Sequence, residues 1–330
     1  MNEPTTAESP LEIVKEAAGS NASDAFSILG NETRLAILVA LWDELEPFAE
    51  DPTKYWVGSA IPFSELRRRV GVRDPGQFHY HIDKLVGRFV RKTDDGFELN
   101  TAGKQVVRTV IATVGFDEQS TEPTEIDDTC PFCGAPTVVS YHNFRLHQFC
   151  TECEGAFSFD EHTKGLIVSW KSFPALLSHG TAEGMYYASL REAAHKYALR
   201  YEGVCARCSG PITRSLHICE AHENHDGSSC PNCSRRFEVA GRFVCDLCKE
   251  GNICSVLKAV LVPHHRVIDE FLVSHGVLPE FPYLTEVPSL ETEVSVISMD
   301  PKRVRVTLGV DDDELDLLVD EDINVVEAAH

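Results

Sequence analysis

Ten of the twelve cysteines in this 330-residue chain fall into five Cys-x-x-Cys pairs, and this spacing constrains the fold more than any other feature. The pairs are Cys130/Cys133, Cys150/Cys153, Cys205/Cys208, Cys230/Cys233 and Cys245/Cys248. Two such pairs supply the four ligands that a structural zinc ion takes in a tetrahedron. The sequence therefore predicts small metal-bound modules after residue 129, with about three structural Zn²⁺ per chain.

The first cluster joins two pairs across 16 residues, which is enough chain for a hairpin. We expect Cys130, Cys133, Cys150 and Cys153 to form a zinc ribbon. Free thiols or an iron–sulfur cluster are the alternatives. Disulfides are not expected, because the chain has no secretory leader or apolar run long enough to span a membrane, and the predicted location is the cytoplasm.

The second cluster, at residues 203–250, holds enough ligands for two ions. They are Cys205, Cys208, Cys219, His222, Cys230, Cys233, Cys245 and Cys248. We favour sequential pairing, 205/208/219/222 and 230/233/245/248. A cross-braced pairing would instead join 205/208 with 230/233, and a third arrangement would use Cys254. Sites with four protein ligands leave no open position for a reacting water, so structural roles are expected and no catalytic residue is predicted. A redox or zinc sensor is the functional alternative.

The N-terminal region, 23–117, has the pattern of a winged helix-turn-helix. Asn31 is a candidate N-cap for an apolar helix, and "FSELRRRVGV" reads as a short helix capped by Ser64 and ended by Gly71. The next helix begins with Asp74 as N-cap and a proline in its first turn. An Asp95-Gly96 hairpin turn and a closing helix from residue 101 to about 114 complete the pattern.

The helix "PGQFHYHIDKL" is the candidate DNA-reading element, because the second helix of this motif enters the major groove. Its apolar face is Phe78, Ile82 and Leu85. From residue 65 to 92 there are eight basic and three acidic residues, a local charge of +5 in a chain of −22. His79 and His81 cannot share a metal ion, because residues two apart lie about 200° apart on a helix. The predicted DNA contacts are Arg67, Arg68, Arg69, Arg73, Gln77, His79, Tyr80, Lys84, Arg91 and Lys92.

The net charge does not exclude a nucleic-acid partner. Acidic residues number 52 against 30 basic ones, which is typical of proteins from salt-loving microbes. In molar salt the Debye length is about 3 Å, so only the local charge of the contact surface matters.

The stretches "AFSILGNETRLAIL" and "FSELRRRVGVRDPGQFHYHIDKL" resemble ArsR-like winged-helix regulators, and the chain resembles the haloarchaeal branch that carries Cys-rich C-terminal modules. The resemblance implies transcriptional regulation, double-stranded DNA as partner and a homodimer formed through the terminal helices, with the transcription machinery as a further candidate partner. No Cys precedes Cys130, so the metal-sensing box of the founding members is missing.

The expected architecture is multi-domain α+β. It comprises a flexible start (1–22), the winged helix (23–117), a linker (118–128), the first zinc ribbon (129–160), a helical connector (161–202), the second Cys-rich region (203–250) and a helix with an antiparallel β tail (251–330). The connector should hold a helix at about 182–201, and a later helix should break at Pro263. A regulator that is not an enzyme is the leading hypothesis; a zinc-ribbon scaffold for protein contacts is the alternative.

Overall fold

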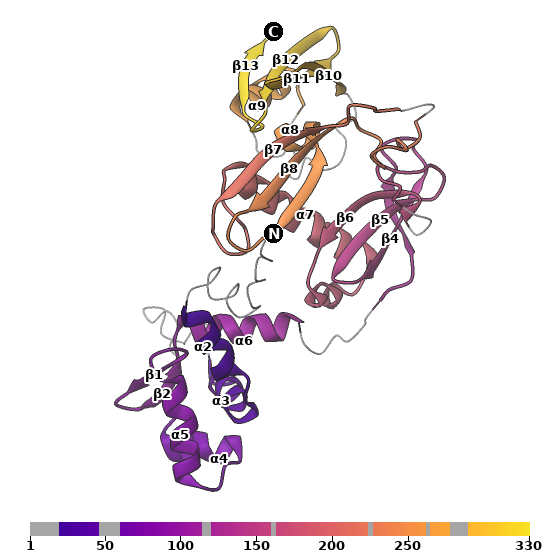
Figure 1. The fold of residues 1–330 in the computed structure, drawn as a ribbon. Coiled ribbons are helices and arrows are strands. Elements are labelled where there is room, and N and C mark those ends of the chain that lie inside the picture. Colours follow the sequence, from indigo (N-terminus) through magenta and orange to yellow (C-terminus); the bar gives the residue numbers. More distant parts are fainter. Residues whose placement is uncertain are drawn as a thin grey trace, which may run out of the picture. The chain divides into compact units, whose positions relative to one another are not determined.

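The computed structural model describes residues 20–45, 60–113, 120–159, 163–223, 227–261, 265–277 and 290–330 (Figure 1). The chain divides near residue 115 into two compact units. It is a multi-domain α+β protein with antiparallel sheets, as expected. Most of the expected flexible start and the expected break at Pro263 lie outside the described residues. Among the described helices, none combines the length and the apolar character needed to cross a membrane.

The first unit consists of helices around a small core, with one two-stranded sheet. Its core is made by Ile37 and Leu38 of the second helix, by Leu66, and by Phe78 and Ile82, all of which are almost fully buried. The elements are α2 (Ser20–Leu29), α3 (Glu32–Trp42), α4 (Phe63–Val70), α5 (Pro75–Leu85), β1 (Val90–Thr93), β2 (Gly96–Leu99) and α6 (Thr101–Thr113).

Local capping signals explain where two of these helices begin. The Asn31 side chain accepts a hydrogen bond from the backbone N–H of Arg34, and Asp74 caps α5 in the same way through Gln77. The expected cap at Ser64 is wrong, because α4 already begins at Phe63 with Pro62 in the cap position. The Phe63 ring packs edge-on against Phe78 at 5.0 Å, so a tertiary contact holds the first residue of this helix in place.

The hairpin turn is one residue earlier than the sequence predicted. Thr93 pairs with Gly96, so Asp94 and Asp95 form the turn and Gly96 is the first residue of β2. Gly96 has φ +144°, and a Cβ atom there would lie 2.2 Å from the Ile61 carbonyl oxygen. Glycine is therefore needed for a close backbone approach rather than for the turn itself.

The second unit contains three antiparallel sheets and its helices. The first sheet comprises β3 (Thr124–Thr129), β4 (Pro136–His142), β5 (Arg145–Cys150) and β6 (Leu166–Lys171). After the 3₁₀ helix η2 (Pro174–His179) and α7 (Ala182–Tyr201) comes the second sheet, β7 (Ile212–Ile218), β8 (Val239–Cys245) and β9 (Gly251–Ser255). Two helices, α8 (Val256–Leu261) and α9 (Arg266–Ser274), precede the last sheet, β10 (Glu291–Met299), β11 (Lys302–Val310), β12 (Asp313–Asp320) and β13 (Val325–Ala329).

One hydrophobic core runs through the second unit, from Ile126 in β3 to Ile323 between β12 and β13. Side chains from all four regions expected as separate modules, 129–160, 161–202, 203–250 and 251–330, contribute to this core, because α7 and the strands bury their apolar faces together. The expected linker at 118–128 also contains most of β3, in which Ile126 is buried in this core but is flanked in sequence by polar residues. A single inward side chain was too weak a signal for a strand.

Candidate metal centres

Four of the five Cys-x-x-Cys pairs share one backbone conformation. In each, the first Cys donates its N–H to the carbonyl five residues later, and the residue after the second Cys donates back to the first Cys carbonyl. That following residue has positive φ, between 55° and 72°. The four residues are Gly134, Ser209, Ser234 and Lys249. This tight turn, called the knuckle below, places both sulfurs on the same side of the chain.

All twelve predicted metal ligands come together in three groups. The first tetrad is Cys130, Cys133, Cys150 and Cys153. The second tetrad is Cys205, Cys208, Cys245 and Cys248, and the third tetrad is Cys219, His222, Cys230 and Cys233. Within each tetrad the ligand atoms lie within 4.8 Å of one another, so each could hold a metal ion.

In the second region the two outer pairs, 205/208 and 245/248, share one tetrad, and the two inner pairs, 219/222 and 230/233, share the other. Neither the sequential nor the cross-braced arrangement predicted this nested pairing. Cys254 belongs to none of the three tetrads and is buried in the core, where burial raises the pKa of its thiol to about 12. The arrangement that used Cys254 as a ligand is therefore wrong as well.

The hairpin of β7 and β8 explains the nested pairing. Its register pairs Ile212 with Cys245 at one end and Ile218 with Val239 at the other. The first end brings the 205/208 knuckle next to the 245/248 knuckle. Just beyond the other end, Cys219 donates its N–H to the Glu238 carbonyl at 3.2 Å, close to the 230/233 knuckle. One strand pair thus has a metal-ligand group at each end.

The first and third tetrads are joined by backbone contacts. Ser158 donates to the Ser234 carbonyl at 3.0 Å, and Arg236 donates to the Ala156 carbonyl at 3.0 Å. The guanidinium of Arg236 also lies 4.4 Å from the centre of the Phe132 ring, inside the first knuckle. These contacts make the two metal-ligand groups parts of one structure.

Backbone N–H groups point at the sulfurs and favour the thiolate form. Burial by itself raises the pKa of Cys150. The backbone N–H groups of Glu152 and Cys153, at 3.3 and 3.2 Å from its sulfur, outweigh that effect, so the pKa is lowered to about 7. Cys245 reaches about 7 chiefly through the Cys248 N–H, and the pKa of Cys230 is also lowered to about 7. Each tetrad therefore has one thiol that ionises near neutral pH, as a metal ligand must.

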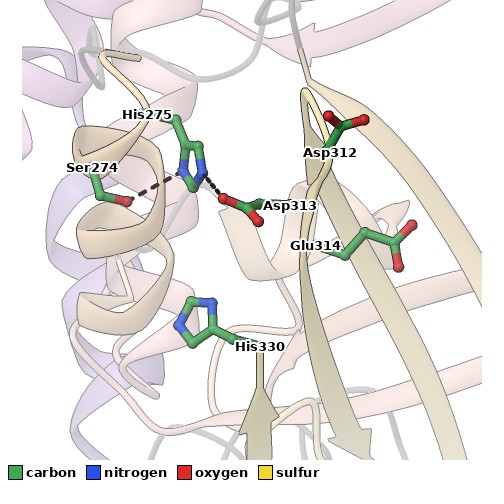
Figure 2. Close-up of a pocket in the computed structure, with 6 residues that line it drawn as sticks. All are labelled: Ser274, His275, Asp312, Asp313, Glu314 and His330. Carbon is green, nitrogen blue, oxygen red and sulfur yellow. Dashed lines mark hydrogen bonds and ion pairs between the residues drawn. The ribbon is translucent and has the colours of Figure 1, made fainter.

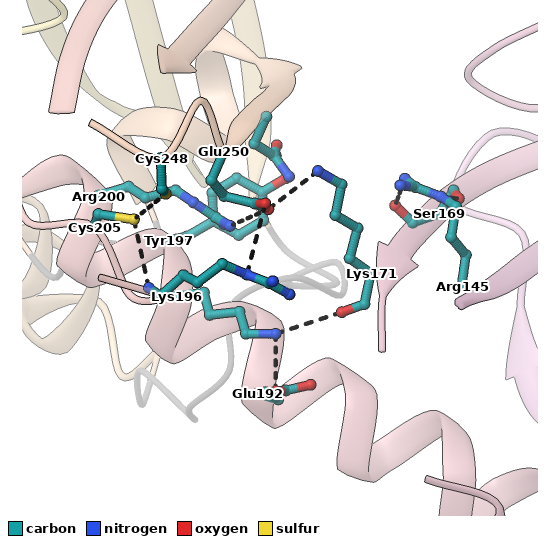
Figure 3. Close-up of polar contacts among 12 residues, drawn as sticks. Arg145, Ser169, Lys171, Glu192, Lys196, Tyr197, Arg200, Cys205, Cys248 and Glu250 are labelled. Atoms are coloured by element: carbon teal, nitrogen blue, oxygen red, sulfur yellow. Dashed lines mark hydrogen bonds and ion pairs between the residues drawn. The ribbon is translucent and has the colours of Figure 1, made fainter. Parts of the chain in front are cut away.

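A cluster of charged side chains anchors the second tetrad to its surroundings (Figure 3). The carboxylate of Glu250, two residues after Cys248, lies 3.2 Å from Lys171 Nζ in β6 and 3.7 Å from Arg200 Nη2 in α7. Arg207, inside the 205/208 knuckle, lies 3.9 Å from the same carboxylate. The Arg200 and Glu250 side chains are mostly buried, so this knuckle pair is held against β6 and α7 rather than only by its own ligands.

A pocket of about 420 Å³ lies between the end of α9 and the last sheet (Figure 2). Its His275 contacts Asp313 through Nε2 at 3.0 Å, and Ser274 lies 3.2 Å from Nδ1. The Phe271 carbonyl is 2.8 Å from Nδ1, so this nitrogen carries a hydrogen and cannot accept the Ser274 proton. The sequence does not indicate this group, because Asp313 lies 38 residues from His275 along the chain. Its hydrogen bonds do not activate the serine.

The predicted DNA contacts lie on α4, α5, the turn between them and β1. Four of these arginines already have partners within the protein. Arg67 donates to the Val72 and Arg73 carbonyls, Arg68 and Arg69 bind Glu65, and Arg91 binds Glu98. His79 contacts Asp83 at 3.2 Å. The side chains that stay exposed without an ion pair in the described part of the chain are Arg73, Gln77, Tyr80, Lys84 and Lys92.

His81 lies at the border of the buried face of α5 and is 8% exposed, with its ring centre 5.3 Å from that of Tyr80. Burial and nearby Arg34 lower the pKa of His81. Its Nδ1 atom has no hydrogen-bond partner among the residues that the structure describes. The two histidines of "HYH" therefore face different surroundings, as helical geometry requires.

Comparison with protein families divides the chain where the structure does. Residues 127–325, more than half of the chain, match the family model of the domain of unknown function DUF7351. Residues 22–110 match the domain of unknown function DUF7347. A search of the curated proteins finds no match.

Proposed function

The chain belongs to the DUF7351 family, and we propose that it is a dimeric DNA-binding transcriptional regulator with three structural zinc ions. In this proposal the first unit is a winged helix-turn-helix of ArsR-like type. The observation that carries the proposal is the division of α5 into a buried face and an exposed face with free donors.

Helix α5 is rigidly placed for reading a groove. Phe78, Ile82 and Leu85 are fully buried, so the rotation of the helix about its axis is fixed. Gln77 and Tyr80 then face solvent within the first two turns, where a helix in the major groove meets base edges. Glutamine pairs with adenine through two hydrogen bonds, which makes Gln77 the best candidate for base recognition.

The charged side chains divide into two groups with different expected roles. Arg73 in the turn, Lys84 on α5 and Lys92 on β1 are exposed and have no acidic partner in the described residues, so they are the candidates for phosphate contacts. Arg67 instead holds the turn between α4 and α5 through two backbone carbonyls. Replacing Arg67 should therefore disturb the fold of the motif before it affects charge.

Apolar side chains exposed on α2, α3 and α6 support a dimer. Phe26 is 71% exposed, Val39 47% and Ile111 51%, and Leu35 and Val110 are also exposed. A second copy is the proposed occupant of this surface, because the resemblance to ArsR-like regulators implies a dimer formed through the terminal helices, here α2 and α6. Two-fold symmetry would place two α5 helices for adjacent half-sites.

The geometry of the tetrads suits zinc. Four sulfurs about 2.3 Å from a tetrahedral ion are about 3.8 Å apart. The Sγ–Sγ separations are 3.6 Å for Cys130–Cys153, 3.5 Å for Cys208–Cys245 and 3.7 Å for Cys205–Cys248. The Cys233 Sγ to His222 Nδ1 separation of 3.5 Å also fits, because zinc–nitrogen bonds are shorter. In such sites the protein supplies every ligand and the ion supplies folding energy.

Fluorescence anisotropy with full-length protein tests the DNA-binding proposal once genome-wide immunoprecipitation has identified bound sites. Gln77→Ala should weaken specific binding by about 1–3 kcal/mol and relax the preference at one base position. Arg73→Ala should weaken binding to all sequences. The slope of log affinity against log salt concentration should fall by about one, because one fewer counterion is released. The matched control is Arg266→Ala, an exposed arginine paired with Glu270 in the second unit. A binding map without sharp peaks, unchanged by Gln77→Ala, would refute the proposal.

A second candidate role, as a redox or zinc sensor, is favoured by one observation. Cys208 and Cys248, both in the second tetrad, are exposed, while the third tetrad has no exposed ligand. Thiolates must be reached by solvent to react with an oxidant. Zinc release on peroxide treatment, followed with a colorimetric chelator, should come first from the second tetrad. Equal release from all three would remove this support.

A further inference from the structure

The residues next to the ligands of the first tetrad lie against the residues next to the ligands of the third. Two backbone hydrogen bonds join the segment after Cys153 to the segment after Cys233. A further bond lies closer to the ligands, because the Glu154 carboxylate accepts from the N–H of Ser229 at 3.0 Å. Glu154 directly follows Cys153, and Ser229 directly precedes Cys230. A movement of either tetrad is therefore transmitted to the backbone that carries the other.

The guanidinium of Arg236 contacts both of these metal-ligand groups. Its Cζ atom lies 4.4 Å from the centre of the Phe132 ring, inside the first knuckle. Gly227 lies in the loop between His222 and Cys230 of the third tetrad and has φ +75°. A Cβ atom at Gly227 would lie 2.3 Å from Nη2 of Arg236, so even an alanine there would displace the guanidinium.

The same guanidinium brings a positive charge to the first tetrad. Its Nη1 atom lies 4.0 Å from Sγ of Cys153. Four thiolates around one Zn²⁺ carry a net charge of about −2. A cation at this distance stabilises that charge, and cysteine sulfur also accepts weak hydrogen bonds from N–H groups. Arg236 is therefore placed to favour the metal-bound state of the first tetrad.

The position of Arg236 depends in turn on the third tetrad. Arg236 directly follows Arg235, whose carbonyl accepts the Cys230 N–H at 2.9 Å and so closes the knuckle of that tetrad. Small structures of this kind are folded with their metal ion and unfolded without it. Loss of the ion from the third tetrad should therefore loosen residues 227–236 and withdraw the guanidinium from Cys153.

We infer that the first and third tetrads bind metal cooperatively, and that Arg236 is the positioning residue that couples them. Metal in the third tetrad places Arg236 against Cys153 and so raises the metal affinity of the first. Coupling between two sites is reciprocal, so metal in the first tetrad raises the affinity of the third by the same factor. The second tetrad is not coupled in this way, because it lies at the other end of the β7–β8 hairpin. The inference rests on the proposed metal binding, but not on DNA binding.

A chelator titration of the full-length, zinc-loaded protein tests the coupling. Thiols that lose their metal are alkylated, and peptide mass spectrometry then reports each tetrad separately. Cys230→Ser combined with Cys233→Ser prevents metal binding by the third tetrad. The first tetrad should then release its ion at a roughly 10-fold lower chelator concentration, a common size for coupling between sites. The control is Cys208→Ser combined with Cys248→Ser, which removes two ligands of the second tetrad and should leave the first unchanged.

Variants of Arg236 keep every metal ligand, so they cover the case in which the ligand variants do not fold. Arg236→Met should weaken metal retention by the first tetrad roughly 10-fold, and loss of the third tetrad should add little to this effect. Arg236→Lys keeps the charge and should restore most of the retention. Gly227→Ala keeps both the charge and the ligands but displaces the guanidinium, so it should also lower retention. The matched control is Arg305→Met, which removes an exposed arginine that lies 3.5 Å from Asp316.

Three results would overturn the inference. The first is a first tetrad that releases its metal at the same chelator concentration with and without the third. The second is an equal effect of the variant in the second tetrad, which would show a general loss of stability. The third is an Arg236→Met protein that retains metal as the unaltered protein does. A purified protein that holds no metal and takes up no added zinc would refute the proposed metal binding itself, and with it the coupling.

Discussion

The nested pairing of the second and third tetrads can be tested by counting metal in double variants. Cys208→Ser combined with Cys248→Ser removes two ligands from one tetrad, so about two ions per chain should remain, because each structural site needs its four ligands. Cys208→Ser combined with Cys219→Ser damages two tetrads and should leave about one. Sequential pairing predicts the opposite: about one ion for the first double variant and about two for the second.

The free energies show why nested pairing is reasonable although it closes a longer loop. Cys208 and Cys245 are 37 residues apart, whereas sequential pairing would join Cys208 to Cys219 across 11. Loop-closure entropy makes the longer loop less favourable by only about 1 kcal/mol. The β7–β8 ladder closes the same loop through seven residue pairs, from Ile212↔Cys245 to Ile218↔Val239. The free energy of this strand pairing more than offsets the entropy difference.

Metal stoichiometry by mass spectrometry under native conditions is the assay. Structural zinc contributes about 10–16 kcal/mol to folding in small zinc-binding peptides. A typical domain is stable by only about 5–15 kcal/mol, so the variants are expected to unfold at lower temperature and should be measured soon after purification. Cys254→Ala is the control, since this cysteine belongs to no tetrad and should leave the metal content unchanged. Equal metal loss in both double variants would refute the nested arrangement.

Three further predictions concern single side chains. Gly96→Ala should destabilise the first unit by roughly 1–3 kcal/mol in urea unfolding, because its Cβ would lie 2.2 Å from the Ile61 carbonyl oxygen; an unchanged midpoint would contradict the close approach. Phe78→Ala should cost about 3–5 kcal/mol, seen as a lower Tm, because the ring is fully buried. Asp313, with the Phe271 carbonyl, raises the pKa of His275, so this contact stabilises the fold fully below about pH 6.5 and is lost as pH rises through the raised value. An NMR titration should show a lower pKa of His275 in Asp313→Asn, and identical curves would exclude the contact.

Local signals predicted local structure well. Asn31 and Asp74 cap their helices because a side-chain oxygen needs only the next turn of backbone as its partner. The Cys-x-x-Cys spacing predicted the knuckles for the same reason, since each knuckle is closed by hydrogen bonds within six residues. The sequence also identified all twelve ligands that the three tetrads bring together.

Signals that depend on distant partners were misread. Ser64 is not the cap of α4, because Phe63 packs on Phe78 and is already helical. Gly96 is required by its close approach to the Ile61 backbone rather than by the turn. The cations of α4 looked free in sequence, although Glu65 already binds two of them. In each case the deciding partner is set by how helices and strands approach one another, which no short window of sequence contains.

The sequence alone determined which residues can hold metal and which face of α5 is buried, because both follow from spacings of a few residues. Only the tertiary structure decided which ligand pairs share an ion. That choice depends on the register of β7 against β8, and it is made by the core side chains on both strands together.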